Sequence, residues 1–293
     1  MTITAKIIDH AITEEGVEIM SVECRYPRFI HSELMTHRTF SRNAASSRAI
    51  PIKKMLHSIK HDMAMPIYWG QNKPGMQAKE ELTGFKLWLA KNIWILTGRI
   101  VCFFVWIFSL LGLHKQIANR MIEPWSHITV LITSTYWENF FALRMHPDAQ
   151  PEFKELARQI YELKIKSEPK LIHFGEWYLP YVYESDREQI KDIEQLKKIS
   201  ISRCASVSYF TVDGKPMTLE KALALSEKLV GSEPLHASPI EHQATPDRKI
   251  QDRKRPKKFD WESPSLWGNF YGWKQNRKMY DKEFVNEYSS RTL

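Results

Sequence analysis

A long apolar run between residues 93 and 113 constrains the fold of this chain most, because its side chains must be buried away from water. The run reads IWILTGRIVCFFVWIFSLLGL and is close to the length of about 20 residues that crosses a bilayer as a helix. Gly98 and Arg99 interrupt it, so that only residues 100 to 113 are free of charge. The sequence therefore favours a helix buried in the core or between subunits, with a membrane span as the alternative.

Length, charge and cysteine content narrow the class of protein. With 293 residues, 43% of them hydrophobic, the chain is long enough to bury a sizeable core. The net charge of +8 fits a partner that is nucleic acid, anionic lipid or a phosphorylated small molecule, and does not choose among them. Three cysteines without C-x-x-C spacing indicate neither a disulfide framework nor a structural zinc site. Because the first residues do not have the pattern of a signal peptide, we expect a cytoplasmic protein.

Hydrophobic periodicity predicts a mixed α+β fold in which helices pack on an antiparallel sheet. Strands are predicted at residues 2–10 and 17–26, as a hairpin, and at residues 125–135. Helices are predicted at residues 29–37, 76–121, 149–164 and 219–230, the last one ended by Gly231. No internal repeat is present.

The segment from residue 36 to residue 51, THRTFSRNAASSRAIP, carries many hydrogen-bond donors and only two large apolar residues, Phe40 and Ile50. Guanidinium groups make bidentate bonds to phosphate, and hydroxyl and backbone N–H groups satisfy the remaining acceptors. The segment therefore indicates an anion site, on a loop or a short helical turn that follows the helix at 29–37. The alternative is a solvated, capped start of a helix.

Two further clusters place polar side chains among aromatic residues or prolines. Asn139 and Arg144 lie among aromatic residues, an arrangement that suits a planar ring or a salt bridge at an interface. Residues 236 to 242, HASPIEH, contain two histidines and a glutamate that could be metal ligands. The prolines around them make a helical H-E-x-x-H geometry implausible, and we expect no metal.

The 36–51 segment resembles a known signature. Its spacing, His37-Arg38-x-x-Ser41-x-Asn43-x-x-Ser46-x-Arg48, is similar to H-R-x-x-S-x-N-x-x-S-x-R of the flavin-dependent thymidylate synthases, the ThyX family. Residues 139–144, NFFALR, followed by 149–152, AQPE, resemble the family's N-F-x-x-L-R and A-Q-x-E. Residues 118–124, ANRMIEP, resemble its A-R-x-x-L-P. These matches occur in the family's order.

The two remaining motifs are out of that order. In most members, R-A-A-R-V-S and H-x-T/S-P-F-E-H precede the signature, whereas residues 203–208, RCASVS, and 236–242, HASPIEH, follow it here. The resemblance therefore implies a circularly permuted ThyX-like fold. It further implies one domain over residues 1–293, with the signature and nucleotide-binding part at 1–200 and a permuted segment at 201–293 that completes the flavin site.

What the resemblance implies for function is the conversion of dUMP to dTMP with methylenetetrahydrofolate, FAD and NADPH, by a homotetramer without nucleic-acid or membrane partners. Members bind dUMP through the positions of Ser46, Arg48, Arg120 and Arg144, and we expect Arg144 and Ser46 to act in catalysis. The positions that hold FAD are His37, Arg38, Asn139, His236, Ser238 and Glu241.

Several positions depart from the family pattern. Thr36 replaces an arginine that contacts the flavin phosphates, Ala44 replaces a frequent glutamate, and Thr133 and Thr135 lie near positions that bind adenine. The basic run at 247–258 is expected to be a solvated loop, with polyglutamylated folate or nucleic acid as possible ligands. Two alternative functions follow: a diverged, inactive flavin- or nucleotide-binding protein, or a basic nucleic-acid-binding protein.

Overall fold

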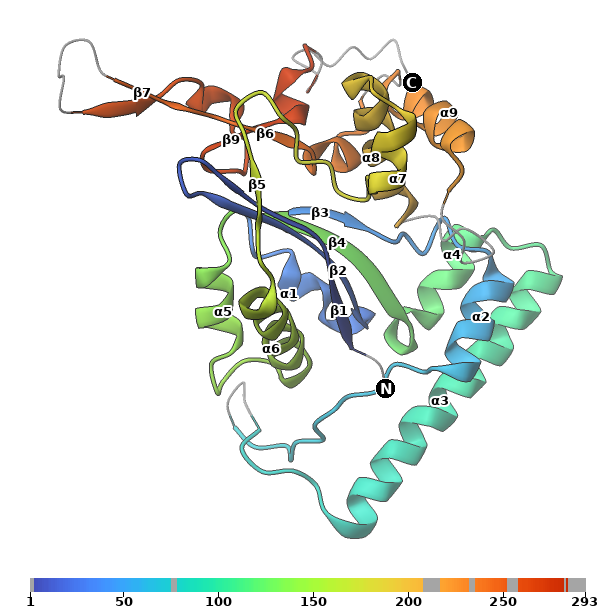
Figure 1. The fold of residues 1–293 in the computed structure, drawn as a ribbon. Coiled ribbons are helices and arrows are strands. Elements are labelled where there is room, and N and C mark those ends of the chain that lie inside the picture. Colours follow the sequence, from blue (N-terminus) through green and yellow to red (C-terminus); the bar gives the residue numbers. More distant parts are fainter. Residues whose placement is uncertain are drawn as a thin grey trace, which may run out of the picture.

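The computed structural model describes residues 3–74, 78–207, 217–231, 235–251, 258–281 and 283. The fold is mixed α+β, as predicted, and is built around a five-stranded sheet with the strand order β3-β4-β2-β1-β5 (Figure 1). Its strands are β1 (Thr4–Thr13), β2 (Glu18–Pro27), β3 (Ser41–Ala44), β4 (His127–Ser134) and β5 (Lys170–Ile172).

The predicted hairpin is confirmed. Strands β1 and β2 pair antiparallel, and Gly16 turns the chain between them with a φ of +78°, a conformation that suits glycine. The four strands from β3 to β1 are antiparallel, but β5 joins the edge of β1 in parallel. The sheet is therefore mixed, and the prediction of a purely antiparallel sheet is wrong at this edge.

The middle of the 36–51 segment is a strand, and the prediction of a loop or helical turn there is wrong. After the short helices η1 (Arg28–Ile30) and α1 (His31–Leu34), the chain enters β3, which pairs with β4 from Ser41 opposite Thr133 to Ala44 opposite Val130. Ser41 and Asn43 are buried, whereas Arg42 and Ala44 are half-buried. This alternation has the period of two that a strand requires.

Helices cover both faces of the sheet (Figure 1). One face packs on an aromatic core that includes Tyr26, Phe40, Phe140 and Phe153. The helices on this face are α5 (Glu138–Arg144) and α6 (Pro151–Lys166). Helices α7 (Glu184–Gln189), α8 (Ile193–Ser206) and α9 (Leu219–Val230) lie on the opposite side, with η3 (Ser238–Glu241) and two small sheets, β6 (Ala244–Pro246) with β9 (Trp273–Gln275) and β7 (Lys249–Gln251) with β8 (Phe259–Trp261). The predictions at 149–164 and 219–230 are confirmed.

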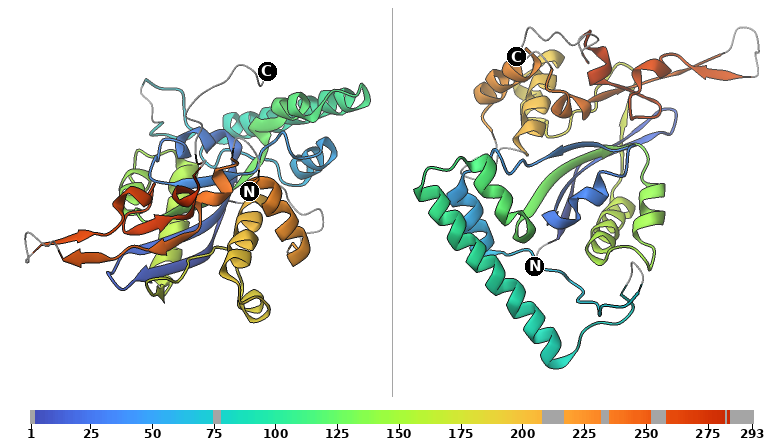
Figure 2. Two further views of the ribbon diagram at one scale, coloured as in Figure 1. Left: turned by 90° about the horizontal axis from the view of Figure 1, so that it is seen from above. Right: turned by 180° about the vertical axis from the view of Figure 1, so that it is seen from behind.

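The helical region predicted at 76–121 is divided. Helix α3 (Gly84–Leu110) is continuous through Gly98 and Arg99, and α4 (Lys115–Ala118) and η2 (Asn119–Trp125) follow it. Together with α2 (Ile52–His61) these elements form the outer edge of the molecule (Figure 2). Only 11% of the most apolar window of α3 is buried, so the prediction of a helix buried in the core is wrong for the single chain.

Gly98 is the point where α3 approaches the rest of the domain most closely. A Cβ atom at this position would lie 2.7 Å from Cδ1 of Trp125 and 2.9 Å from the terminal methyl of Met63. The indole of Trp125 is held in place, because its Nε1 donates to the Trp94 carbonyl at 3.1 Å. Only glycine therefore allows this contact between α3 and η2.

We predict that Gly98→Val lowers the free energy of unfolding by about 1 to 3 kcal/mol, because the added side chain overpacks a contact that is already closed. Urea unfolding measures the effect. Thr97→Val is the matched control, since Thr97 is exposed on the same helix. Equal urea midpoints for the two variants would contradict this account of the α2–α3–η2 packing.

Candidate functional site

Three segments that are far apart in the sequence meet at Asn43 in β3. The Asn43 side-chain nitrogen donates to the Cys204 carbonyl at 2.5 Å, and its side-chain oxygen accepts from the Ser238 hydroxyl at 3.2 Å. Asn43 is buried, so these bonds satisfy amide groups that are removed from water. One residue of the 36–51 segment therefore joins α8 to η3.

The contact between β3 and the C-terminal part of the chain extends along the strand. The Ser41 hydroxyl accepts from Gln275 at 3.0 Å and from Asn269 at 3.3 Å. In the neighbouring strand, the Thr133 hydroxyl bonds to Nδ1 of His242 at 2.8 Å. Burial lowers the pKa of His242 to about 3, so this ring is neutral. Side chains from η3 and from the region of β9 thus bond to β3 and β4.

The sequence argument did not assign Gln275, Asn269 or Arg277 to the site. Their amides hold Ser41, and Arg277 forms an ion pair with Glu241. The only local signal was the mixture of amides and aromatics between residues 266 and 278.

Arg144 and His37 are bonded to each other. Nε of Arg144 donates to Nε2 of His37 at 2.8 Å, and the guanidinium lies 4.8 Å from the ring centre of Phe153. Because arginine only donates, Nε2 of His37 is an acceptor and its proton is on Nδ1. Burial, with the nearby charges of Arg144 and Arg42, lowers the pKa of His37 to about 4 and keeps the ring neutral.

Two other side chains orient the Arg144 guanidinium. Its Nη2 donates to the Thr36 hydroxyl at 3.1 Å, and its Nη1 lies 3.3 Å from the Glu33 carboxylate. The Thr36 hydroxyl in turn donates to the Glu33 carbonyl at 2.7 Å. Thr36, which departs from the family pattern, therefore has a defined role as a support for Arg144. Glu33 has no motif that would have identified it from the sequence.

Arg144 opens onto a hollow of about 620 Å³. Glu33, His146, Asp148 and Gln150 share its lining with Arg144. A neighbouring hollow of about 820 Å³ shares Asp148 and Gln150 with the first. The AQPE segment, residues 149–152, thus borders both. Its Glu152 is buried and accepts from the Ile67 amide at 2.8 Å, which ties the 64–70 segment to the start of α6.

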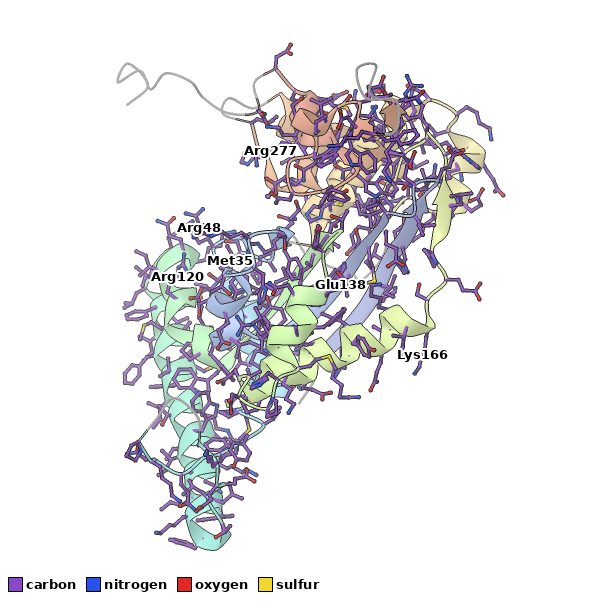
Figure 3. All side chains as sticks on the ribbon, turned by 90° about the vertical axis from the view of Figure 1, so that its left-hand side faces the viewer. Met35, Arg48, Arg120, Glu138, Lys166 and Arg277 are labelled. Carbon is purple, nitrogen blue, oxygen red and sulfur yellow. The ribbon has the colours of Figure 1, made fainter. Side chains whose placement is uncertain are left out.

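A second group of candidate residues consists of Ser46, Arg48 and Arg120. We call this group the phosphate corner. The Asn119 amide donates to the carbonyls of Ser47 and Ile50, both at 2.8 Å, and so joins η2 to the 36–51 segment. Both arginines are exposed, and Figure 3 shows them at the same corner of the molecule.

The acidic side chain of Glu123 organises this corner. It accepts from the Ser47 hydroxyl at 2.5 Å and from Arg120 at 3.2 Å. Ser46 is half-buried beside it. Two exposed guanidinium groups are suited to a phosphate, which accepts several hydrogen bonds at once.

Of the residues predicted to hold FAD, four are exposed and two are already bonded to other side chains. Arg38, Asn139, His236 and Ser238 are exposed, although Ser238 also bonds to Asn43. The other two, His37 and Glu241, are already bonded to Arg144 and Arg277. Arg42, which was not assigned to FAD, donates to the carbonyls of Leu34 and His37. Burial raises the pKa of Glu241, and Arg277 and Arg42 oppose that effect.

The metal alternative does not follow from the described geometry. The His242 ring faces Thr133 in the interior, whereas the Glu241 carboxylate faces Arg277. His236 is exposed on the loop before η3. The side chains of His242 and Glu241 are thus bonded to different partners and do not form a common site. Part of the 203–208 motif, Ser208, and residues 252–257 of the basic run lie outside the described residues.

No model of a known protein family matches the chain, and no curated protein sequence matches it. Among solved structures, it is similar to the UMP/dUMP methylase PolB from Streptomyces cacaoi bound with 5-Br UMP, with a TM-score of 0.46, 15% identity, and coverage of 56% of this chain and 89% of that one. For the same methylase bound with 5-Br dUMP the values are 0.45, 14%, 56% and 91%. At this level the likeness assigns neither a family nor a reaction.

We predict that Asn43→Ala lowers the free energy of unfolding by about 2 to 3 kcal/mol, because it leaves the buried Cys204 carbonyl without its amide donor. Chemical denaturation measures the loss. Asn139→Ala, an exposed asparagine, serves as the control and should change stability by less than about 0.5 kcal/mol. If the two variants are equally stable, Asn43 does not hold the three segments together.

A second prediction concerns the protonation of His37. Its pKa is about 4 in the folded chain, below the ordinary value of 6.5, so the unfolded chain binds more protons between these two values. The contribution of His37 to stability is therefore complete above pH 6.5 and is lost as the pH falls toward 4. His37→Gln should reduce the slope of stability against pH in this window. If the slope is identical to that of the wild type, the pKa of His37 is not lowered by folding.

Proposed function

We propose that this chain converts dUMP to dTMP in a reductive methylation, with methylenetetrahydrofolate as the carbon donor, FAD as the hydride carrier and NADPH as the reductant. The signature resemblance supports this reaction, and one structural observation supports it most. Asn43 of the signature bonds to Cys204 and Ser238, which are 161 and 195 positions away in the sequence. These partners belong to the two segments that resemble the family's remaining motifs.

The same observation supports a circular permutation. In a permuted chain the motifs keep their positions in space while their order in the sequence changes, which is tolerated where natural termini lie at the surface. The meeting of 36–51, 203–207 and 236–242 at one strand is what such a change would preserve. Residues 201–293 then complete a site that begins in residues 1–200, within one domain.

In the proposed reaction, the phosphate corner binds the nucleotide. Arg48 and Arg120 supply guanidinium groups for the dUMP phosphate, and Glu123 orients Arg120 before the substrate arrives. Ser46 contributes a hydroxyl to the same nucleotide. It acts by position and not as a nucleophile, because the signature offers it no neighbouring base: His37 is nine residues away, and its Nε2 already accepts a hydrogen bond from Arg144.

Arg144 acts on the pyrimidine. Its guanidinium is fixed by His37, Thr36 and Glu33 before any substrate is present. A donor that is already oriented stabilises negative charge developing on the ring without the cost of rearranging during the reaction. The hollow of about 620 Å³ beside Arg144 is large enough for a pyrimidine ring.

The exposed residues fit a flavin nucleotide in their chemistry. Arg38 offers a guanidinium for the diphosphate, and Asn139, Ser238 and His236 offer polar groups for the rest of the molecule. FAD, when bound, supplies the hydride transfer that no side chain can perform. The threonine at position 36 removes one phosphate contact, since its hydroxyl is committed to Arg144. We further propose a cytoplasmic homotetramer whose sites combine residues of several subunits.

The decisive experiment measures the oxidation of reduced flavin by the purified chain. Oxidation that requires both dUMP and methylenetetrahydrofolate, and that yields dTMP, supports the proposal. Binding of dUMP and flavin without turnover would instead identify a diverged, inactive nucleotide-binding protein. A chain that binds neither dUMP nor flavin would overturn the proposal entirely.

For the nucleotide, we predict that Arg48→Ala and Arg144→Ala each weaken dUMP binding by about 2 to 4 kcal/mol, because each removes a charged partner from the bound nucleotide. Calorimetry measures the change. Arg158→Ala is the matched control, since Arg158 is exposed on α6 and bound to Glu155 and Glu162. Unchanged dUMP affinity in both test variants would exclude these arginines from the site.

A further inference from the structure

Helix α3 exposes an apolar face along its whole length, which we call the outer face of α3. Large side chains on this face are exposed to solvent at regular helical spacing, so the face is continuous. They are Phe85, Leu89, Ile93, Leu96, Ile100, Phe103 and Leu110. With 27 residues, the helix is about 40 Å long. Exposed apolar surfaces of this size mark interaction sites.

The opposite face of α3 is already covered by the domain. Gly98 and Val105 are buried, and Val105 belongs to an apolar cluster with Ile59 of α2 and Ile122 of η2. The part of α3 around Gly98 and Val105 lies against α2 and η2, whereas the N-terminal end of the helix extends beyond the rest of the domain (Figures 1 and 2). Because one side of the helix packs on α2 and η2, the exposed side can lie against a membrane surface with the helix in its plane.

Helix α3 carries basic residues and no acidic ones, whereas Glu80, Glu81 and Glu123 lie just outside the stretch from 83 to 122. Residues 83 to 122 contain five Lys or Arg and no Asp or Glu. Lys86 and Arg99 lie beside the outer face and are exposed, so their long side chains can reach headgroups while the apolar residues enter the interface. Each basic residue near an anionic bilayer contributes about 1 kcal/mol of attraction.

We infer that the outer face of α3 docks this protein onto an anionic lipid bilayer, with the helix parallel to the membrane plane. The apolar side chains provide burial and the flanking basic residues provide selectivity for negative headgroups. This inference goes beyond the proposed reaction, which concerns a different part of the molecule. It also replaces the expectation of no membrane partner, which came from the family resemblance.

A second copy of the chain fits this face less well. Two copies packed through α3 would bring together two helices that each carry three basic residues, Lys86, Lys91 and Arg99, and no acidic residue, and like charges at an interface are unfavourable. The exposed apolar side chains also include Phe104, Trp106 and Leu111, which widen the face beyond the narrow stripe that a pair of helices buries.

The test is cosedimentation of the full chain, purified without detergent, with vesicles of phosphatidylcholine containing about one-third phosphatidylglycerol. We expect binding to these vesicles and at least about tenfold weaker binding to pure phosphatidylcholine.

Ile100→Asp, in the centre of the outer face, should weaken binding at least about tenfold. Ile165→Asp on α6 is the matched control, because Ile165 is 63% exposed and Ile100 is 48% exposed; its affinity should stay within about twofold of the wild type.

A variant without the basic side chains tests their contribution to binding. Lys86→Gln combined with Arg99→Gln should weaken binding to the anionic vesicles about tenfold, whereas Lys166→Gln on α6 should not. Circular dichroism establishes that each variant is folded. The inference is overturned if the wild type does not bind vesicles, or if Ile100→Asp binds as well as the wild type. It is also overturned if ultracentrifugation shows an oligomer that Ile100→Asp dissociates while vesicle binding is absent, since a second copy would then cover the face.

Discussion

The architecture depends on one buried amide. Asn43 lies in a strand of only four residues, and its two side-chain atoms bind the end of α8 and the start of η3. Without these bonds the C-terminal third of the chain would have few polar ties to the signature strand. Because a buried amide must satisfy both its donor and its acceptor, the position of each partner is set within narrow limits. This is how segments distant in sequence form one surface.

The neutral state of His37 is the second constraint. A protonated ring could not accept the hydrogen bond from Arg144, and the guanidinium would lose the partner that fixes its plane. The aromatic rings of Phe40 and Phe153 on either side of His37 keep water away and so maintain the neutral form. An apolar core thereby controls the orientation of a charged group at the surface of a hollow.

The sequence predicted those helices and strands whose hydrophobic periodicity is clear within the segment itself. The hairpin, α6 and α9 follow from their periodicity, and the residues of the 36–51 segment could be named. Strand β3 could not be predicted, because its buried residues, Ser41 and Asn43, are polar and are satisfied by groups more than 150 positions away. The exposure of α3 was likewise invisible, since composition records how apolar a helix is and not what covers it. Glu33 belongs to no motif, and the only signal for Gln275 was the mixture of amides and aromatics around it.

The place of β3 at the end of the sheet has a further consequence. A terminal strand offers unpaired backbone groups to any other chain, and proteins protect such edges by covering them. Here the cover is supplied by η3 and by the side chains of Asn269 and Gln275, which come from the last third of the chain. During synthesis the strand is complete long before its cover exists. A nascent or shortened chain would therefore present an open sheet edge, and the C-terminal segment protects the protein against aggregation as well as completing its site.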